Sequence, residues 1–193
     1  MFRTIRAKFR ERTMREWVDL LADAKLDLPR VAFMFNPDTA PFYDPYLRLF
    51  KELPRRSSVE VVPVRVQSLS DIETAIANLA REPNCGLIAA SDVYILAARE
   101  TILKTADRYR MPVISPYRQF AIEGALISYG PDTADIFRRS ASYIDRILKG
   151  ESPGNLPFQS PAKFELIVNL KKAKALGLSI RESFLLLADE IIE

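Results

Sequence analysis

The sequence contains no histidine and a single cysteine, Cys85. Without histidine the chain lacks the commonest general base and the commonest metal ligand, so Ser-His-Asp and Cys-His chemistry cannot occur within one chain. One cysteine excludes an intrachain disulfide and a thiolate metal cluster. We interpret Cys85 as a small buried residue ahead of an apolar strand. Chemistry based on carboxylates or lysine alone stays open.

Long apolar runs and glycine-rich loops are also missing. No stretch of about 18 apolar residues is present, which predicts that the chain has no membrane span. The chain has six glycines, and none of them forms a phosphate-cradling loop. The N-terminus is basic but lacks the apolar region of a secretory signal peptide, so the sequence as given shows no recognisable signal peptide.

Positive charge is concentrated at the N-terminus. The net charge is +3, and residues 1–12 carry Arg3, Arg6, Lys8, Arg10 and Arg12 against Glu11. We interpret residues 1–12 as a solvated basic tail, with contact to nucleic acid or an anionic membrane as the alternative. The rest of the chain has no basic stripe interleaved with aromatics, so we expect no nucleic-acid partner.

Apolar residues recur with the spacing of alternating strands and helices. We predict strands at 31–35, 59–66, 86–90, 111–114, 124–129 and 164–170, and helices at 13–28, 42–53, 70–82, 93–108, 131–150, 171–176 and 181–191. Pro63 indicates that its strand lies at an edge, and the spacing of Ser70 and Glu73 fits a capping box. Short connections between alternating strands and helices predict an α/β fold, a three-layer α/β/α parallel sheet.

Polar side chains follow three of the predicted strands. In parallel sheets, ligands bind beyond the carboxyl ends of the strands, so we predict a ligand-binding site there. The candidate residues are Asn36, Asp38 and Thr39 after the first strand, Ser91 and Asp92 after the third, and Tyr117 and Arg118 after the fourth.

Each of these residues also has a structural interpretation. Asp38 or Thr39 can cap the following helix, whereas Asn36 is less easily explained as a cap. Asp92 suits a ligand ammonium group and the start of the 93–108 helix equally well. Arg118 offers a bidentate fork to a carboxylated ligand, or a surface salt bridge to Glu123.

Several segments resemble the ABC-transporter substrate-binding family that includes tryptophan- and tyrosine-type binding proteins. They are RVAFMFNPDTAP, VQSLSDIETAIANLAREPNCGLI, RYRMPVISPYRQFAIEGALISYGPD, YIDRILKGESPGNLPFQSPAKFELIVNLKKAKALGL and the closing ADEIIE. The resemblance spans residues 13–193. The ISYGPD turn and the tail that follows ILKGE are its most specific parts.

The resemblance implies a type I periplasmic-binding fold with two lobes and a cleft between them. It places residues 13–130 in lobe two. It implies that a crossover helix, a strand and C-terminal helices, residues 131–193, complete lobe one in full-length relatives. Measured against the pattern of this family, we expect the sequence to lack a signal and nearly all of lobe one. We therefore expect Phe164, Leu166 and Val168 to lack packing partners, and we expect a homodimer through unpaired parts of 131–193.

The implied function is solute capture for an ABC import system, with a small polar solute such as an amino acid as ligand and an ABC permease as partner. The resemblance implies neither catalysis, nor a cofactor, nor a metal. It implies a periplasmic or membrane-associated location, or a cytoplasmic one if Met1 is the native start. The alternatives are a cytoplasmic sensing or interaction module of the same fold, and a carboxylate-dependent hydrolase using Asp38, Asp92 and Glu123.

Overall fold

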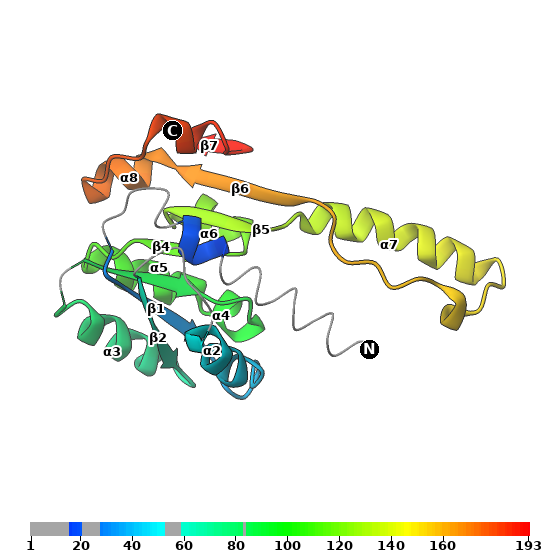
Figure 1. The fold of residues 1–193 in the computed structure, drawn as a ribbon, viewed down its shortest axis with the longest axis horizontal. Helices are drawn as coiled ribbons and strands as arrows, with labels where there is room; N and C mark the ends of the chain where they lie inside the picture. Colours follow the sequence, from blue (N-terminus) through cyan, green and yellow to red (C-terminus); the bar gives the residue numbers. More distant parts are fainter. Residues whose placement is uncertain (1–15, 21–27, 53–58, 83) are drawn as a thin grey trace.

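The computed structural model describes residues 16–20, 28–52, 59–82 and 84–193. In these ranges the strands form one seven-stranded sheet with the order β2-β1-β3-β4-β5-β6-β7 (Figure 1). Strands β1 to β5 are parallel, while β6 runs antiparallel to β5 and pairs in parallel with β7. The strands are β1 (Arg30–Phe35), β2 (Glu60–Arg65), β3 (Cys85–Ala89), β4 (Val113–Ser115), β5 (Ile127–Pro131), β6 (Phe164–Asn169) and β7 (Glu190–Ile192). The predicted α/β class is confirmed, and β2, which contains Pro63, lies at an edge as expected.

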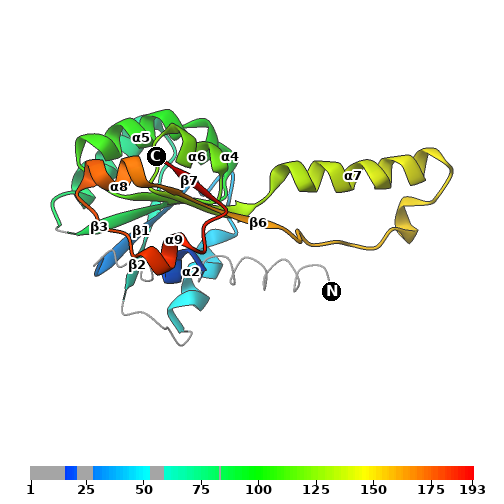
Figure 2. The same cartoon turned by 90° about the horizontal axis from the view of Figure 1, so that it is seen from above.

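Helices cover both faces of the sheet, which gives three layers (Figure 2). Side chains of β1 alternate between the faces, as the pleat of a strand requires. Phe33 and Phe35 pack with helical residues 16–20, α2 (Tyr43–Glu52) and α9 (Glu182–Leu185). Ala32 and Met34 face the opposite layer, which contains α3 (Leu69–Leu79), α4 (Val93–Ala97), α5 (Arg99–Arg108) and α6 (Arg118–Glu123). The rest of the predicted 13–28 helix lies outside the described residues.

Three local predictions need correction. The capping box of α3 is formed by Ser68 and Asp71, not by Ser70 and Glu73, because the helix begins two residues earlier. The predicted 93–108 helix breaks at Ala98, where the backbone has φ −85° and ψ 6°. Helix α6 was not predicted, and the predicted 181–191 helix is α9 followed by β7.

Strand β6 is paired and largely buried, so the expectation that it would lack packing partners is wrong. It exchanges ladder hydrogen bonds with β5, and β7 covers its other edge. Leu166 and Val168 are buried in the core, and Phe164 lies against Tyr129 with ring centroids 5.6 Å apart. Residues 164–193, including α8 (Leu170–Leu176) with its left-handed C-cap Gly177, therefore join the same sheet as residues 30–131.

Residues 132–163, which we call the arm, project from the sheet (Figures 1 and 2). The arm consists of α7 (Thr133–Leu148), a short 3-10 turn (Pro153–Asn155) and the chain that returns to β6. Helix α7 has an apolar side, yet none of its residues is buried. Within the described ranges, no helix is long and apolar enough to cross a membrane.

Candidate functional site

The loops at the carboxyl ends of β1, β3 and β4 carry the predicted site residues. Strand β1 is followed in the chain by β2 on one side, whereas β3 and the later strands lie on its other side. The strand order therefore reverses between β1 and β3, and open α/β sheets bind ligands at such a switch point. The loop after β1 holds Asn36 and Thr39, and the loop after β3 holds Ser91 and Asp92, so the two loops flank this point.

The Asp92 carboxylate joins these two loops. One oxygen accepts the hydroxyl proton of Thr39 at 2.6 Å and the backbone N–H of Tyr94 at 2.9 Å. The other oxygen accepts the backbone N–H of Asn36 at 2.7 Å. Asp92 is buried and is the N-cap of α4, so its predicted capping role is confirmed. Its three hydrogen bonds fix the spacing of the loops on either side of the switch point.

Asn36 shapes the turn after β1. Its side-chain oxygen accepts the backbone N–H groups of Asp38, at 2.7 Å, and Thr39, at 3.3 Å. Asn36 therefore closes this turn with its own side chain and is buried. Helix α2 begins only at Tyr43, so the expectation that Asp38 or Thr39 caps it is wrong. Asp38 instead lies exposed and accepts a 2.8 Å hydrogen bond from the side chain of Gln67, which the sequence analysis did not select.

Tyr117 brings an aromatic ring to the same edge from the end of β4. Burial raises the pKa of its hydroxyl above the usual value, a hydrogen bond to Ser91 opposes this rise, and the charge of Asp92 adds to it. The phenol is therefore neutral near pH 7 and presents a hydrogen-bonding group next to Ser91. A second tyrosine, Tyr43, donates to the Ser91 carbonyl oxygen at 3.2 Å, and it was missed because it lies on α2.

Arg118 is held by two carboxylates from the far strands of the sheet. Its guanidinium lies 2.6 Å from Glu190 on β7 and 3.8 Å from Glu165 on β6. The expected salt bridge to Glu123 is wrong, because Glu123 pairs with Arg99 at 2.9 Å. Among the residues that the structure describes, no cluster of three or more potential ligand side chains is placed to hold a metal ion.

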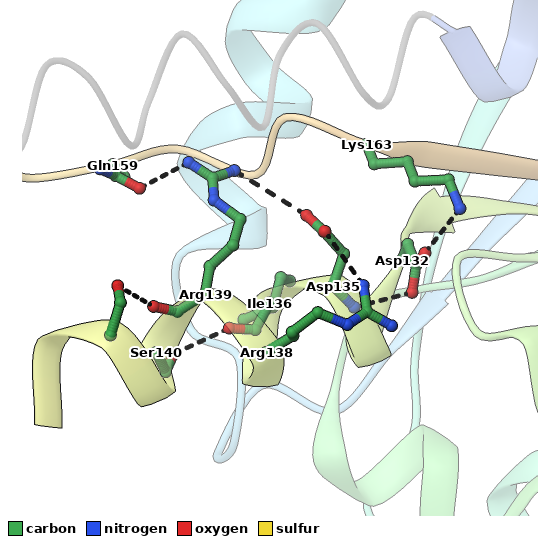
Figure 3. A network of polar contacts seen from close by, with 9 residues as sticks. Asp132, Asp135, Ile136, Arg138, Arg139, Ser140, Gln159 and Lys163 are labelled. Carbon is green, nitrogen blue, oxygen red and sulfur yellow. Dashed lines mark hydrogen bonds and ion pairs between the residues drawn. The ribbon is translucent and has the colours of Figure 1, made fainter. Parts of the chain in front are cut away.

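The base of the arm is a polar cluster that begins where β5 ends (Figure 3). Asp132 is the N-cap of α7, accepting the N–H of Asp135 at 3.0 Å, and its carboxylate also pairs with Lys163 at 2.9 Å. The Asp132 N–H donates to the Lys163 carbonyl at 3.0 Å, so the two chain segments that enter the arm are joined directly. Arg139 donates to Gln159 at 2.5 Å further along the arm.

Protonation of Asp132 should loosen this base. The hydrogen bond from Asp135 and then the pairing with Lys163 lower the pKa of Asp132 below its usual value. A lowered pKa in the folded state means that the stabilisation is complete above about pH 4 and is lost as the pH falls through the folded-state pKa. An NMR titration of the Asp132 carboxyl carbon should give a midpoint below about 3.9. Lys163→Gln should raise that midpoint, and a midpoint at or above the free value in the unmodified chain would contradict the prediction.

A hollow lies at the opposite, amino end of the sheet. It measures about 240 Å³ and is lined by Cys85, Tyr109, Arg110 and Met111, among others. Cys85 is buried as predicted, and burial raises the pKa of its thiol. None of the predicted ligand-binding residues contributes to this hollow, which makes it a useful control region.

Comparison with proteins of known structure supports the fold. A conserved domain protein from Vibrio cholerae superposes with a TM-score of 0.80 at 24% identity over 92% of this chain, and a Streptococcus pneumoniae ABC domain in complex with L-Trp superposes with a TM-score of 0.78 at 18% identity over 91%. Each match covers 59% of the other protein. At this level of identity the superpositions establish the fold alone.

Two curated relatives match part of the chain. An uncharacterized protein of Rickettsia prowazekii is 24% identical over 127 residues, which are 66% of this chain and 42% of that protein. A tyrosine-binding protein of Clostridioides difficile is 24% identical over 124 residues, which are 64% of this chain and 36% of that protein. The chain thus spans well under two thirds of these relatives. The model of the family "ABC transporter substrate binding protein", a family of solute-binding proteins and not of enzymes, matches residues 10–192, and the chain belongs to that family.

Proposed function

We propose that this chain forms one of the two lobes, or jaws, of a solute-binding protein for an ABC importer. Its ligand in this proposal is an amino acid with an aromatic side chain. The observation that carries the proposal is the row of polar and aromatic side chains at the switch point, held in place by Asp92. The L-Trp complex and the tyrosine-binding relative support this choice of ligand. By family, the partner is an ABC permease and the location is outside the cytoplasmic membrane.

The proposed contacts come from the accessible members of the site. The exposed Thr39 hydroxyl donates a hydrogen bond to Asp92, so its oxygen can still accept a hydrogen bond from a ligand ammonium group. Asp38 is exposed beside it and adds negative charge. Ser91 supplies a hydroxyl, and the half-buried Tyr117 supplies a ring for stacking on an aromatic ligand.

The remaining predicted residues support these contacts in our proposal. Asn36 and Asp92 are buried and hydrogen-bonded, so they position the loops. Arg118 is engaged by Glu190 and Glu165, which anchors the first residue of α6 next to Tyr117 in the chain. No step in this function makes or breaks a covalent bond. Ligand binding would favour the closed form of the two jaws through its higher affinity for that form.

We expect the chain by itself to bind L-Trp and L-Tyr weakly. If half of the contacts supply half of the binding free energy, a micromolar complex becomes a complex of about 1 mM. A titration followed by amide NMR should therefore show saturation in the millimolar range, with shifts at residues 36–39, 91–94 and 115–117. Sub-micromolar binding, or shifts confined to the hollow near Cys85, would contradict the proposal.

Two tyrosine substitutions make this test specific. Tyr117→Ala removes the proposed stacking surface and should weaken binding by about tenfold, which corresponds to about 1.4 kcal/mol. Tyr109→Ala is the matched control, because Tyr109 is exposed at the opposite edge of the sheet. Equal affinities of the two variants would show that Tyr117 is not part of the site.

A further inference from the structure

Carboxylates and cations both lie near the proposed ligand site, and they differ in whether they are paired. Arg65 lies opposite Phe35, where β2 and β1 end. Its Nε donates to both carboxylate oxygens of Asp44, at 3.0 and 3.2 Å. The same guanidinium lies over the ring of Phe35, 5.9 Å from the ring centroid. Asp44 therefore already occupies the bidentate fork with which Arg65 could bind the carboxylate of a ligand.

Two further cations at this end of the sheet, in the described part of the chain, are paired as well. Arg118 lies between Glu190 and Glu165, so two negative charges surround one positive charge. Lys163 pairs with Asp132 at 2.9 Å at the base of the arm (Figure 3). These cations therefore offer no unpaired positive charge to a ligand.

Two carboxylates of the site, by contrast, form no ion pair with any described residue. Asp38 is exposed and accepts a 2.8 Å hydrogen bond from the neutral side chain of Gln67. Asp92 is buried, and its three donors are a hydroxyl and two backbone N–H groups, all of them neutral. Thr39 lies between the two carboxylates, because it follows Asp38 in the chain and donates to Asp92 at 2.6 Å. A positive charge placed at the Thr39 hydroxyl would therefore be stabilised by both.

The ring of Tyr117 adjoins this position. Its hydroxyl is hydrogen-bonded to Ser91 and interacts with the charge of Asp92. The side chain is only half-buried, so part of the ring is open for stacking. Asp92 thus neighbours both Thr39 and Tyr117. An ammonium group and an aromatic ring joined by a short alkyl chain suit these two positions.

We propose, on the basis of the function proposed above, that this jaw recognises its ligand by the ammonium group and the aromatic ring and contributes no ion pair to the ligand carboxylate. A carboxylate brought to the same place would lose its water without gaining a cation, and it would face the charges of Asp38 and Asp92. The chemical class that suits this jaw is therefore an aromatic amine. Selection of amino acids over the corresponding amines then depends on the opposing jaw.

Three indole ligands that differ in their charged groups test the proposal. Tryptamine has the ammonium group alone, 3-(indol-3-yl)propionate has the carboxylate alone, and L-Trp has both. In amide NMR titrations of the full chain near pH 7, tryptamine should bind at least as tightly as L-Trp and should shift residues 36–39, 91–94 and 115–117. The propionate should bind at least about tenfold more weakly than tryptamine, because it forms no charge-assisted hydrogen bond at this site.

A pair of charge-removing variants makes the test specific. Asp38→Asn keeps the shape of the side chain and should weaken tryptamine binding about threefold, without weakening binding of the propionate. Asp107→Asn is the matched control and should change neither affinity. Asp107 pairs with Lys172 and lies two residues before Tyr109, which lines the hollow at the amino end of the sheet. Raising the salt concentration from about 20 mM to about 300 mM should weaken tryptamine binding less in Asp38→Asn than in the control.

The possible outcomes separate this inference from the proposed function. Suppose that L-Trp binds at these residues but tryptamine binds about tenfold more weakly, or that the propionate binds as tightly as tryptamine. This jaw then holds the carboxylate, for instance at the first turn of α6, which has no side-chain cap, and the inference is overturned while the proposed function stands. If neither L-Trp nor tryptamine shifts residues 36–39, 91–94 and 115–117, both proposals fail. Equal effects of Asp38→Asn and Asp107→Asn on tryptamine binding also overturn the inference.

Discussion

Replacing Asp92 with alanine should lower the free energy of unfolding by about 3–5 kcal/mol. The substitution removes the acceptor for the backbone N–H groups of Asn36 and Tyr94 and for the hydroxyl of Thr39. A buried donor left without an acceptor costs about 1–3 kcal/mol, and loss of an N-cap costs about 1 kcal/mol more. Since whole domains are stable by only about 5–15 kcal/mol, urea unfolding should detect the loss easily.

Two further variants separate this effect from a general loss of charge. Asp38→Ala removes an exposed carboxylate from the same loop and should change stability by less than about 0.5 kcal/mol. Asp92→Asn keeps one oxygen acceptor but turns an amide N–H₂ toward one of the donors, so its cost should be intermediate. If Asp92→Ala unfolds at the same urea concentration as the unmodified chain, Asp92 does not join the loops as we describe.

Gly130→Ala should be the most damaging of the six glycine-to-alanine substitutions, because its added Cβ makes the shortest contact with backbone atoms. A Cβ built on Gly130 would lie 2.0 Å from the carbonyl oxygen of Pro116, which is backbone and cannot rotate away. Gly130 is not among the glycines with positive φ, so space and not conformation requires glycine here. Relief of the clash must separate the loop after β4 from β5, and Tyr117 is the next residue in that loop. We expect a loss of about 3 kcal/mol or more.

The control for this prediction is Gly154→Ala in the arm. An added Cβ there meets only the Ser152 hydroxyl oxygen at 3.8 Å, an ordinary contact. Its effect on stability should stay within about 0.5 kcal/mol. Amide NMR should show that Gly130→Ala shifts residues 115–118 most strongly, and weakened L-Trp binding should accompany those shifts. Equal stability of the two variants would contradict the close approach of Pro116 and Gly130.

The order and type of most elements could be predicted because their signals are local. The continuous apolar run of β1, the capping residue of α7 and the left-handed cap at Gly177 are each set by a few neighbouring residues. The placement of β6 could not be predicted in this way, since its partner strand β5 lies far away in the sequence. The three residues of β7 are too few to show a period, so the pattern of the preceding helix was extended over them.

In the candidate site, too, local features could be predicted from the sequence, whereas contacts between distant residues could not. The loops after β1, β3 and β4 meet at one edge as predicted, because carboxyl ends of parallel strands must do so. The partners within the site depend on distant residues and could not be predicted. Arg118 pairs with Glu190, 72 positions along the chain, and Asp92 accepts the N–H of Asn36, 56 positions before it. Backbone groups carry no residue-specific signal, so the role of Asn36 as a turn cap was visible only in the structure.

The arm has a further consequence for motion, because it is attached by two chain segments and not by one. The segments enter at Asp132 and leave at Lys163, and the hydrogen bond between them keeps the attachment points adjacent. Two adjacent fixed points define a line, so any body carried by the arm can swing about that line but resists turning in other directions. A domain attached to this arm would thus move toward the switch point by rotation about a single hinge axis.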